Sequence, residues 1–203
     1  MNININANSS IQIEDFYFDP FMITRKMPSA KYVFITHTHY DHLSPEALEK
    51  VVDKNTILIA PTDAKQQLEE SFNNKIIYVK PGDKLTLDGV KVEVFASYNI
   101  NKPFHQKSSN WVGYKLTHSG ITYAVVGDTD ATPELENLSC DVLFVPIGGT
   151  YTMNGEEAAR LTNIIKPNLV IPMHYGSIVG TKEDEKIFLK LLDKEIKYQI
   201  LIK

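Results

Sequence analysis

The sequence contains a single cysteine, Cys140, so an internal disulfide cannot form, and a chain of this length does not need one. Cys140 begins the apolar stretch CDVLFVPI, and no neighbour that would lower the pKa of its thiol can be identified in the sequence. We therefore expect this cysteine to be a small buried hydrophobic residue and not a nucleophile.

An excess of basic charge is also missing. The chain has 21 lysines and arginines against 25 aspartates and glutamates, a net charge of −4, and only two arginines, Arg25 and Arg160. Because no cluster of cations is available to neutralise phosphates, a nucleic acid is not an expected partner.

Neither a secretion signal nor a membrane span is found. The N-terminal MNININANSS lacks the positive charge and the apolar core of a signal peptide. No apolar run reaches the roughly 18 residues that a membrane helix needs. These absences predict a cytoplasmic protein that does not associate with a membrane.

What remains is the composition of an ordinary globular domain. Hydrophobic residues make up 43% and charged residues 23% of the 203 positions. We expect one domain spanning residues 1–203, with a core large enough to hold a buried, pre-organised site. The sequence is also compatible with a homo-oligomer.

Predicted strands and helices are interspersed along the whole chain. Strands are predicted within residues 9–20, 31–36, 56–60, 76–79, 84–87, 90–96, 111–117, 121–126, 142–147, 169–173 and 197–202. Helices are predicted from Ser44 to about 53, about 63–72, after Asn154, and about 182–194. The pairs Asp88-Gly89 and Ser119-Gly120 predict β-hairpins. This order indicates a layered α/β domain with mixed sheets.

The stretch ITHTHYDHL, residues 35–43, concentrates side chains that bind metals. His37 and His39 are two residues apart, so in an extended chain both imidazoles point to the same side and can reach one ion. Asp41 and His42 are adjacent, and they can share that direction only if the chain turns sharply. The pattern therefore predicts two neighbouring metal positions, the second served by Asp41 and His42. Imidazole and carboxylate ligands suit zinc, and also iron or manganese.

Three further candidates lie at strand ends or in loops. His174 ends an apolar strand in PMHYG, and Asp128 in GDTD follows the apolar strand TYAVVG. His105 lies in the long polar loop 97–110, where a surface position and a site position are both consistent with the sequence. His118, beside a predicted turn, has no feature of a site residue.

The motifs HTHYDH, GDTD and MHYG, with a histidine-containing loop between the first two, resemble in this order the metallo-β-lactamase-fold hydrolase superfamily. GGTYTM and IPMHYG make the chain similar to the small ascorbate-6-phosphate-lactonase-like branch. The resemblance implies an α/β (α+β) fold, a four-layer αββα sandwich of two mixed β-sheets with helices on the outer faces. In this family the third histidine usually follows its strand closely, whereas here SYNINKPF intervenes.

The resemblance also implies a complete ligand set for two Zn²⁺ ions, with Mn²⁺ or Fe²⁺ as alternatives. The first ion would be held by His37, His39 and His105, the second by Asp41, His42 and His174, with Asp128 bridging the two. Asp41 would in addition be catalytic, orienting the attacking water or carrying a proton.

The expected function is that of a metal-dependent hydrolase that uses a metal-bound hydroxide on a small-molecule ester, lactone or phosphorylated substrate. Asn99, Thr150, Tyr151 and Tyr175 flank the motifs and are candidates for substrate binding. The alternatives are a phosphodiesterase or nuclease of the same superfamily, which the acidic composition disfavours, and a non-catalytic metal-binding regulatory protein. The complete ligand set argues against this last alternative.

Overall fold

A computed structural model describes residues 2–202 of the chain. The chain divides into two compact units, Met1–Lys80 and Pro81–Lys203, each built around its own mixed β-sheet. The predicted metal ligands are shared between the units, with four in the first and three in the second.

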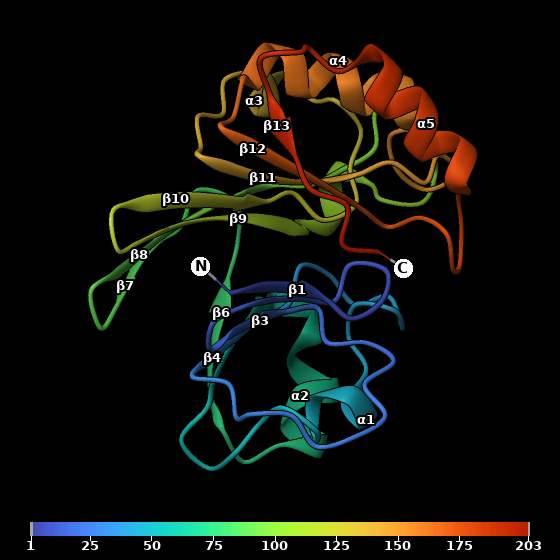
Figure 1. Ribbon diagram of the computed structural model, residues 1–203. Helices are drawn as coiled ribbons and strands as arrows, with labels where there is room; N and C mark the ends of the chain where they lie inside the picture. Colours follow the sequence, from blue (N-terminus) through green and yellow to red (C-terminus); the bar gives the residue numbers. More distant parts are fainter. Residues whose placement is uncertain (1, 203) are drawn as a thin grey trace. The chain divides into compact units, whose positions relative to one another are not determined.

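The sheet of the first unit contains six strands in the order of the sequence. These are β1 (Ile3–Ile5), β2 (Ile11–Ile13), β3 (Phe16–Phe18), β4 (Tyr32–Phe34), β5 (Ile57–Pro61) and β6 (Lys75–Val79). The pairs from β1 to β3 are antiparallel, and those from β3 to β6 are parallel. The helical segments of this unit, which lie on one side of the sheet in Figure 1, are α1 (Pro45–Leu48), η1 (Thr62–Ala64) and α2 (Lys65–Ser71).

Alternation along the strands gives this sheet two apolar faces. In β4 and the residue after it, Val33 and Ile35 belong to the cluster that includes Leu48 of α1 and Leu68 of α2. The alternate residue Phe34 points to the other face and stacks on Phe18 of β3, with 4.9 Å between the ring centroids. Both faces are buried, which explains why β4 and β5 read as continuous apolar runs.

The sheet of the second unit contains seven strands in the order β13-β12-β11-β10-β9-β8-β7. Their bounds are β7 (Lys84–Leu87), β8 (Val90–Ala96), β9 (Val112–His118), β10 (Ile121–Val125), β11 (Val142–Pro146), β12 (Leu169–Met173) and β13 (Lys197–Tyr198). The pairs from β7 to β10 are antiparallel, and those from β10 to β13 are parallel.

Two tight turns join the antiparallel strands of this sheet, as predicted. Asp88 and Gly89 have φ angles of 46° and 86°, and Ser119 and Gly120 have φ angles of 52° and 77°. Two consecutive residues with positive φ match the twist of the flanking strands, which is why these sequence pairs favour hairpins.

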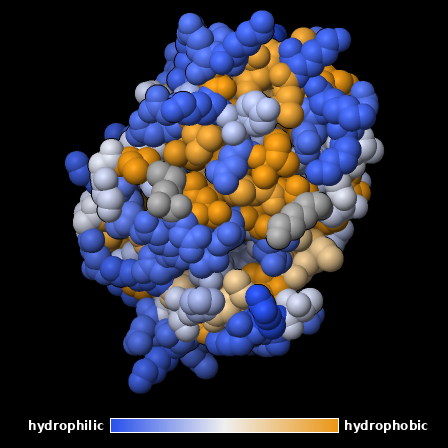
Figure 2. Space-filling model, in the orientation of Figure 1, coloured by the Kyte–Doolittle hydropathy of each residue, from blue (hydrophilic) through white to orange (hydrophobic). Residues whose placement is uncertain are grey.

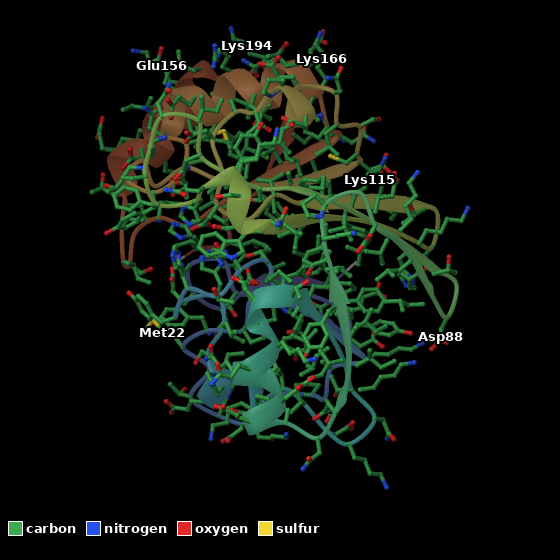
Figure 3. The ribbon with its side chains drawn as sticks, turned by 180° about the vertical axis from the view of Figure 1, so that it is seen from behind. Met22, Asp88, Lys115, Glu156, Lys166 and Lys194 are labelled. Atoms are coloured by element: carbon green, nitrogen blue, oxygen red, sulfur yellow. The ribbon has the colours of Figure 1, made fainter. Side chains whose placement is uncertain are left out.

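The helices of the second unit are α3 (Pro133–Glu136), α4 (Gly155–Ile165) and α5 (Lys182–Leu191), with a short 3₁₀ turn, η2 (Lys107–Ser109). The predicted capping box at the start of α4 is present, with reciprocal bonds between Asn154 and Glu157. Figure 3 labels Glu156 and Lys166 at opposite ends of α4, where their charges complement the helix dipole. Within residues 2–202, no helix has the length and apolar content that crossing a bilayer requires.

Both long helices are amphipathic. Leu161 of α4 and Phe188 of α5 are fully buried in the cluster that covers one face of the sheet. Ile164, Ile187 and Leu191 are exposed, and Figure 2 shows hydrophobic residues among hydrophilic ones in the region of these helices. The inward residues attach the helical layer to β11 and β12, the strands that lead into the predicted site.

Several element boundaries differ from the predictions. The helix after Ser44 ends at Leu48, because the chain tightens into turns in which the amide of Val51 donates to the carbonyl of Leu48. The last strand is limited to Lys197–Tyr198 at the exposed sheet edge. The strand β1 was not predicted, since isoleucines that alternate with asparagines also occur in loops, and its pairing with β2 decides its structure.

The long loop 97–110 is attached to α3 by a polar cluster around Glu134. The hydroxyl of Tyr98 and the ammonium of Lys107 each donate to this carboxylate at 2.7 Å. The bond from Lys107, and then that from Tyr98, lowers the pKa of Glu134 to about 2. The loop is therefore anchored on both sides of His105, the predicted site residue within it.

We predict that Glu134→Gln lowers the free energy of unfolding at pH 7 by about 0.5 kcal/mol, a small value because the pair is solvent-exposed. A carboxyl whose pKa is lowered on folding stabilises the protein above its unfolded pKa and loses this effect as the pH falls towards its folded pKa. The difference from wild type should therefore shrink between pH 5 and pH 2 in urea unfolding of the metal-free protein. Glu136→Gln is the control, and an effect of Glu134→Gln that does not depend on pH would contradict the prediction.

Candidate metal centre

In the first unit, the four predicted ligands form two pairs. His37 Nε2 lies 3.1 Å from His39 Nδ1, and His42 Nε2 lies 3.4 Å from Asp41 Oδ2. The amides of His42 and Leu43 both donate to the carbonyl of His39, at 2.9 and 2.8 Å, which is the sharp turn that the adjacent Asp41 and His42 require. His37, Asp41 and His42 are buried, and His39 is half-buried.

A buried carboxylate, Asp19, determines the orientation of this loop. It follows β3 with a φ of 43°, and its Oδ1 accepts the amide of Thr36 at 2.8 Å. Its Oδ2 accepts the Thr36 hydroxyl at 2.6 Å and His42 Nδ1 at 2.7 Å. Burial raises the pKa of Asp19, and the contacts with His42 and Thr36 counteract part of this effect.

These bonds also determine which nitrogen of two histidines carries the proton. His42 Nδ1 donates to Asp19, so in the neutral ring Nε2 keeps its lone pair. The only hydroxyl proton of Thr36 goes to Asp19, so its oxygen accepts from His37 Nδ1, 3.0 Å away. Both histidines therefore present Nε2, and the ligand atoms of His37 and His42 lie within 4.8 Å of each other.

Asp41 also has a partner that was not among the predicted site residues. The amide Nδ2 of Asn8 donates to Asp41 Oδ2 at 2.8 Å, and both side chains are buried. Neither Asn8 nor Asp19 belongs to the motifs that predicted the metal ligands. Their roles arise only when the N-terminal strands pair beside β4.

In the second unit, Asp128 lies between two histidines. Asp128 Oδ2 is 3.0 Å from His174 Nε2 and 3.5 Å from His105 Nε2. Asp128 follows β10 and His174 follows β12, and these strands run parallel on either side of β11. Their carboxyl ends therefore meet at one edge of the sheet, the usual place for a site in such folds. All three side chains are buried.

The backbone near His174 is tightly constrained. His174 itself has a φ of 56°, an uncommon value for a residue with a side chain. A Cβ added to Gly148 would lie 2.2 Å from the carbonyl oxygen of His174, so only glycine allows this approach. The next residue, Gly149, has a φ of 86°, a conformation that favours glycine.

The four predicted substrate residues differ in their surroundings. Thr150 is exposed, and the half-buried ring of Tyr151 makes an edge contact with Phe104, 4.6 Å between centroids. Tyr175 is fully buried in the core, and its hydroxyl donates to Glu185 at 2.5 Å. Asn99 is buried with its amide bonded within the protein. The contacts of Tyr175 and Asn99 point to structural roles.

Cys140 is half-buried, and burial raises the pKa of its thiol to about 12. The raised pKa favours the neutral thiol at neutral pH, in agreement with the prediction that Cys140 is not a nucleophile, whereas the prediction of a fully buried position is wrong.

The donor sets have the chemistry and the spacing that a metal ion requires. Two nitrogens bound to one tetrahedral zinc at about 2.0–2.1 Å lie about 3.3 Å apart. The paired donor atoms of each unit are separated by 3.0 to 3.5 Å. Imidazole nitrogens and carboxylate oxygens are also the ligands that zinc, iron and manganese share. The residues of each unit thus fit a metal site.

Comparison with known proteins identifies the family. The sequence model of the Beta-lactamase superfamily domain matches residues 8–174, which include every predicted ligand. The chain belongs to this superfamily. It is 27% identical over 195 residues to a UPF0173 metal-dependent hydrolase of Thermococcus onnurineus, covering 90% of this chain and 87% of the relative.

Solved structures agree with this assignment. A crystal structure of a candidate metal-dependent hydrolase from Parabacteroides distasonis has a TM-score of 0.84 at 28% identity, covering 99% of this chain and 93% of that one. The metallo-beta-lactamase fold protein YhfI of Bacillus subtilis has a TM-score of 0.73 at 14% identity, covering 98% and 91%. The predicted fold class, an α/β sandwich with two mixed sheets, is confirmed.

We predict that Asp19→Asn lowers the free energy of unfolding by about 2 kcal/mol. The amide offers one acceptor oxygen to three donors and turns an N–H toward one of them, leaving buried groups without a partner. Urea unfolding of the metal-free protein measures the change. Asp15→Asn, an exposed residue near the same strand, is the charge-matched control, and an equal loss in both variants would contradict the role of Asp19.

Proposed function

We propose that the chain is a metal-dependent hydrolase with a two-ion site built from the ligands that the sequence resemblance implies. The observation that carries the proposal is that each unit contains buried imidazole–carboxylate pairs at ligand spacing. In the first unit, Thr36 and Asp19 accept from the Nδ1 atoms of His37 and His42, so the Nε2 atoms of these two rings carry no proton. Membership of the superfamily supports the same conclusion, because the matched region spans both ligand sets.

The proposed ligand assignment is the one that the sequence motifs imply. One ion would be held by His37, His39 and His105, and the other by Asp41, His42 and His174, with Asp128 contributing to both. The pairing of His37 with His39 and of Asp41 with His42 supports this division. The position of one Asp128 oxygen near the Nε2 atoms of both His105 and His174 supports a bridging role.

When bound, the cations would acidify a water molecule and polarise the carbonyl or phosphoryl oxygen of the substrate. The other tasks belong to the side chains. Asp41, whose Oδ2 is held by Asn8, is oriented to accept the proton of the attacking water on its carboxylate. Asp19 and Thr36 keep the imidazoles in place, so that little reorganisation is needed during the reaction.

The proposed substrate is a small-molecule ester, lactone or phosphorylated compound. The net charge of −4 supports this over a nucleic acid, whose backbone would require a basic surface. Zn²⁺ is the proposed metal because imidazole is the main ligand type, and Mn²⁺ or Fe²⁺ would fit the same donors. The ascorbate-6-phosphate-lactonase-like assignment and the cytoplasmic location remain predictions of the sequence.

The first test is the metal content of the pure protein after reconstitution with zinc or manganese. We expect about two ions per chain, the number that the paired ligand sets can hold. Inductively coupled plasma mass spectrometry after removal of loosely bound metal gives the stoichiometry. A protein that retains no metal would contradict the proposal.

The second test is hydrolysis of a panel of lactones, phosphodiesters and thioesters by the metal-loaded protein. His37→Ala should lower the activity by at least about 100-fold, more than loss of a residue that only orients a ligand. Circular dichroism checks that the variant is folded. His118→Ala removes a histidine of β9 outside the ligand set, and this control should retain both the ions and the activity. Retained activity in His37→Ala would place the chemistry elsewhere.

A further inference from the structure

Asn99 is a buried side chain of the loop 97–110, and it connects a predicted ligand to two other segments. Its exposed fraction is 6%. Its Oδ1 lies 3.1 Å from both the amide nitrogen and the ring Nδ1 of His105. Its Nδ2 donates to the carbonyl of Tyr151 at 3.0 Å and to Asp130 Oδ1 at 3.3 Å. Every polar atom of this amide therefore has a partner within the protein.

The orientation of the amide is determined by its partners. The backbone N–H of His105 can only donate, so the Asn99 atom that faces it is the oxygen. The carbonyl of Tyr151 can only accept, so the atom that faces it is the nitrogen. If the amide were flipped, its NH2 group would face the N–H of His105 and its oxygen would face the carbonyl of Tyr151, and both hydrogen bonds would be lost.

This orientation selects one tautomer of His105. Because Asn99 Oδ1 is an acceptor, the ring nitrogen beside it, Nδ1, carries the proton. In the neutral ring, Nε2 then keeps its lone pair, and this nitrogen is the one 3.5 Å from Asp128 Oδ2. Asn99 thus acts on His105 as Asp19 acts on His42, with a neutral acceptor instead of a carboxylate.

Asn99 also explains how His105 returns to the sheet after the intervening residues. The backbone N–H of Asn99 donates to the backbone carbonyl of His105 at 2.7 Å. Together with the bonds of the Asn99 side chain, it closes the segment 100–104 into a loop. The closed segment has exposed apolar residues, Ile100 and Phe104, and no ligand of its own. His105 therefore stays in hydrogen-bonding contact with Asn99, although the segment 100–104 separates the two residues in the sequence.

The other end of the amide is held by Asp130, a residue of the GDTD motif. Asp130 accepts the backbone amide of Ile100 at 2.8 Å and forms an ion pair with Lys102. A carboxylate whose charge is balanced by Lys102 gives Asn99 Nδ2 a fixed acceptor. A chain of polar contacts thus connects the partly exposed Lys102, through Asp130 and Asn99, to the predicted ligand His105.

We propose that Asn99 is a positioning residue that fixes the Nδ1–H tautomer of His105 and thereby sets the affinity for one of the two metal ions. This inference rests on the proposed function through the assignment of His105 as a ligand. It replaces the prediction that Asn99 contacts substrate, because both ends of its amide are bonded within the protein.

The test compares Asn99→Leu, which has a similar size and no acceptor, with Asn99→Asp, which keeps an acceptor oxygen toward the ring. Two readouts are used on zinc-loaded protein. The first is the exchange-protected Nδ1 proton of His105 in long-range ¹H–¹⁵N spectra, assigned by its loss in His105→Ala. The second is the affinity for each ion, measured by competition with a chelator.

Asn99→Leu should lose the protected proton and bind one ion about 10–100-fold more weakly, the usual effect of removing a partner of a ligand. Asn99→Asp should retain the proton and weaken binding less than Asn99→Leu, because one oxygen still accepts from the ring while the other no longer donates to Tyr151 and Asp130. Asn101→Ala, an exposed residue of the same loop, is the matched control and should change neither readout. If Asn99→Leu does not fold by circular dichroism, the smaller Asn99→Ala takes its place.

Two results would overturn the inference while leaving the proposed function intact. One is a protected proton that persists in a folded Asn99→Leu, and the other is an unchanged affinity in Asn99→Leu although His105→Ala weakens one ion. If His105→Ala binds both ions as tightly as wild type, the ligand assignment itself fails, and the role of Asn99 fails with it. The three results are distinguishable because His105→Ala is measured separately.

Discussion

An imidazole can bind a metal only through a nitrogen that carries no proton, and the loops of the proposed ligands depend on that constraint. Each neutral ring has one proton, so an acceptor behind the ring has to hold it on the far nitrogen. Asp19 does this for His42, the Thr36 oxygen does it for His37, and Asn99 does it for His105. The acceptors are buried, which strengthens their bonds and makes the loss of any one costly.

The acceptors differ in charge, and their surroundings differ accordingly. Asp19 is a buried carboxylate, and its burial is compensated by three donors, two of them from Thr36. Asn99 is neutral and needs no such compensation, but an amide can flip, and here the carbonyl of Tyr151 and the carboxylate of Asp130 prevent it. In both arrangements the imidazole, His42 or His105, has a fixed orientation and carries its proton on Nδ1.

The sheets supply the rigid frame on which these loops depend. Asp128 and His174 follow parallel strands of one sheet, so their positions are tied to the hydrogen-bond register of β10, β11 and β12. The left-handed backbone of His174 and the absence of a side chain at Gly148 show how closely the chain is packed there. Strain of this kind is typical of functional sites, where the surrounding core determines the conformation.

Much of the protein could be predicted from the sequence because the interactions involved join residues that are close together along the chain. The two hairpins follow from residues that tolerate positive φ, and the capping box of α4 depends on residues three positions apart. The division of the ligand loop into His37 with His39 and Asp41 with His42 also follows from spacing. The ligand types and their order along the chain are visible for the same reason, since they form short motifs at strand ends.

Only the tertiary structure determines which residues hydrogen-bond to the proposed ligands. Asn8 is 33 positions from Asp41, and Asp19 is 23 positions from His42, so only strand pairing brings them together. Asn99 is close to His105 in sequence, but its amide is oriented by Asp130 and Tyr151, 31 and 52 positions away. A sequence motif records which atoms can bind a metal, whereas the proton on each ring depends on hydrogen bonds that exist only in the folded chain.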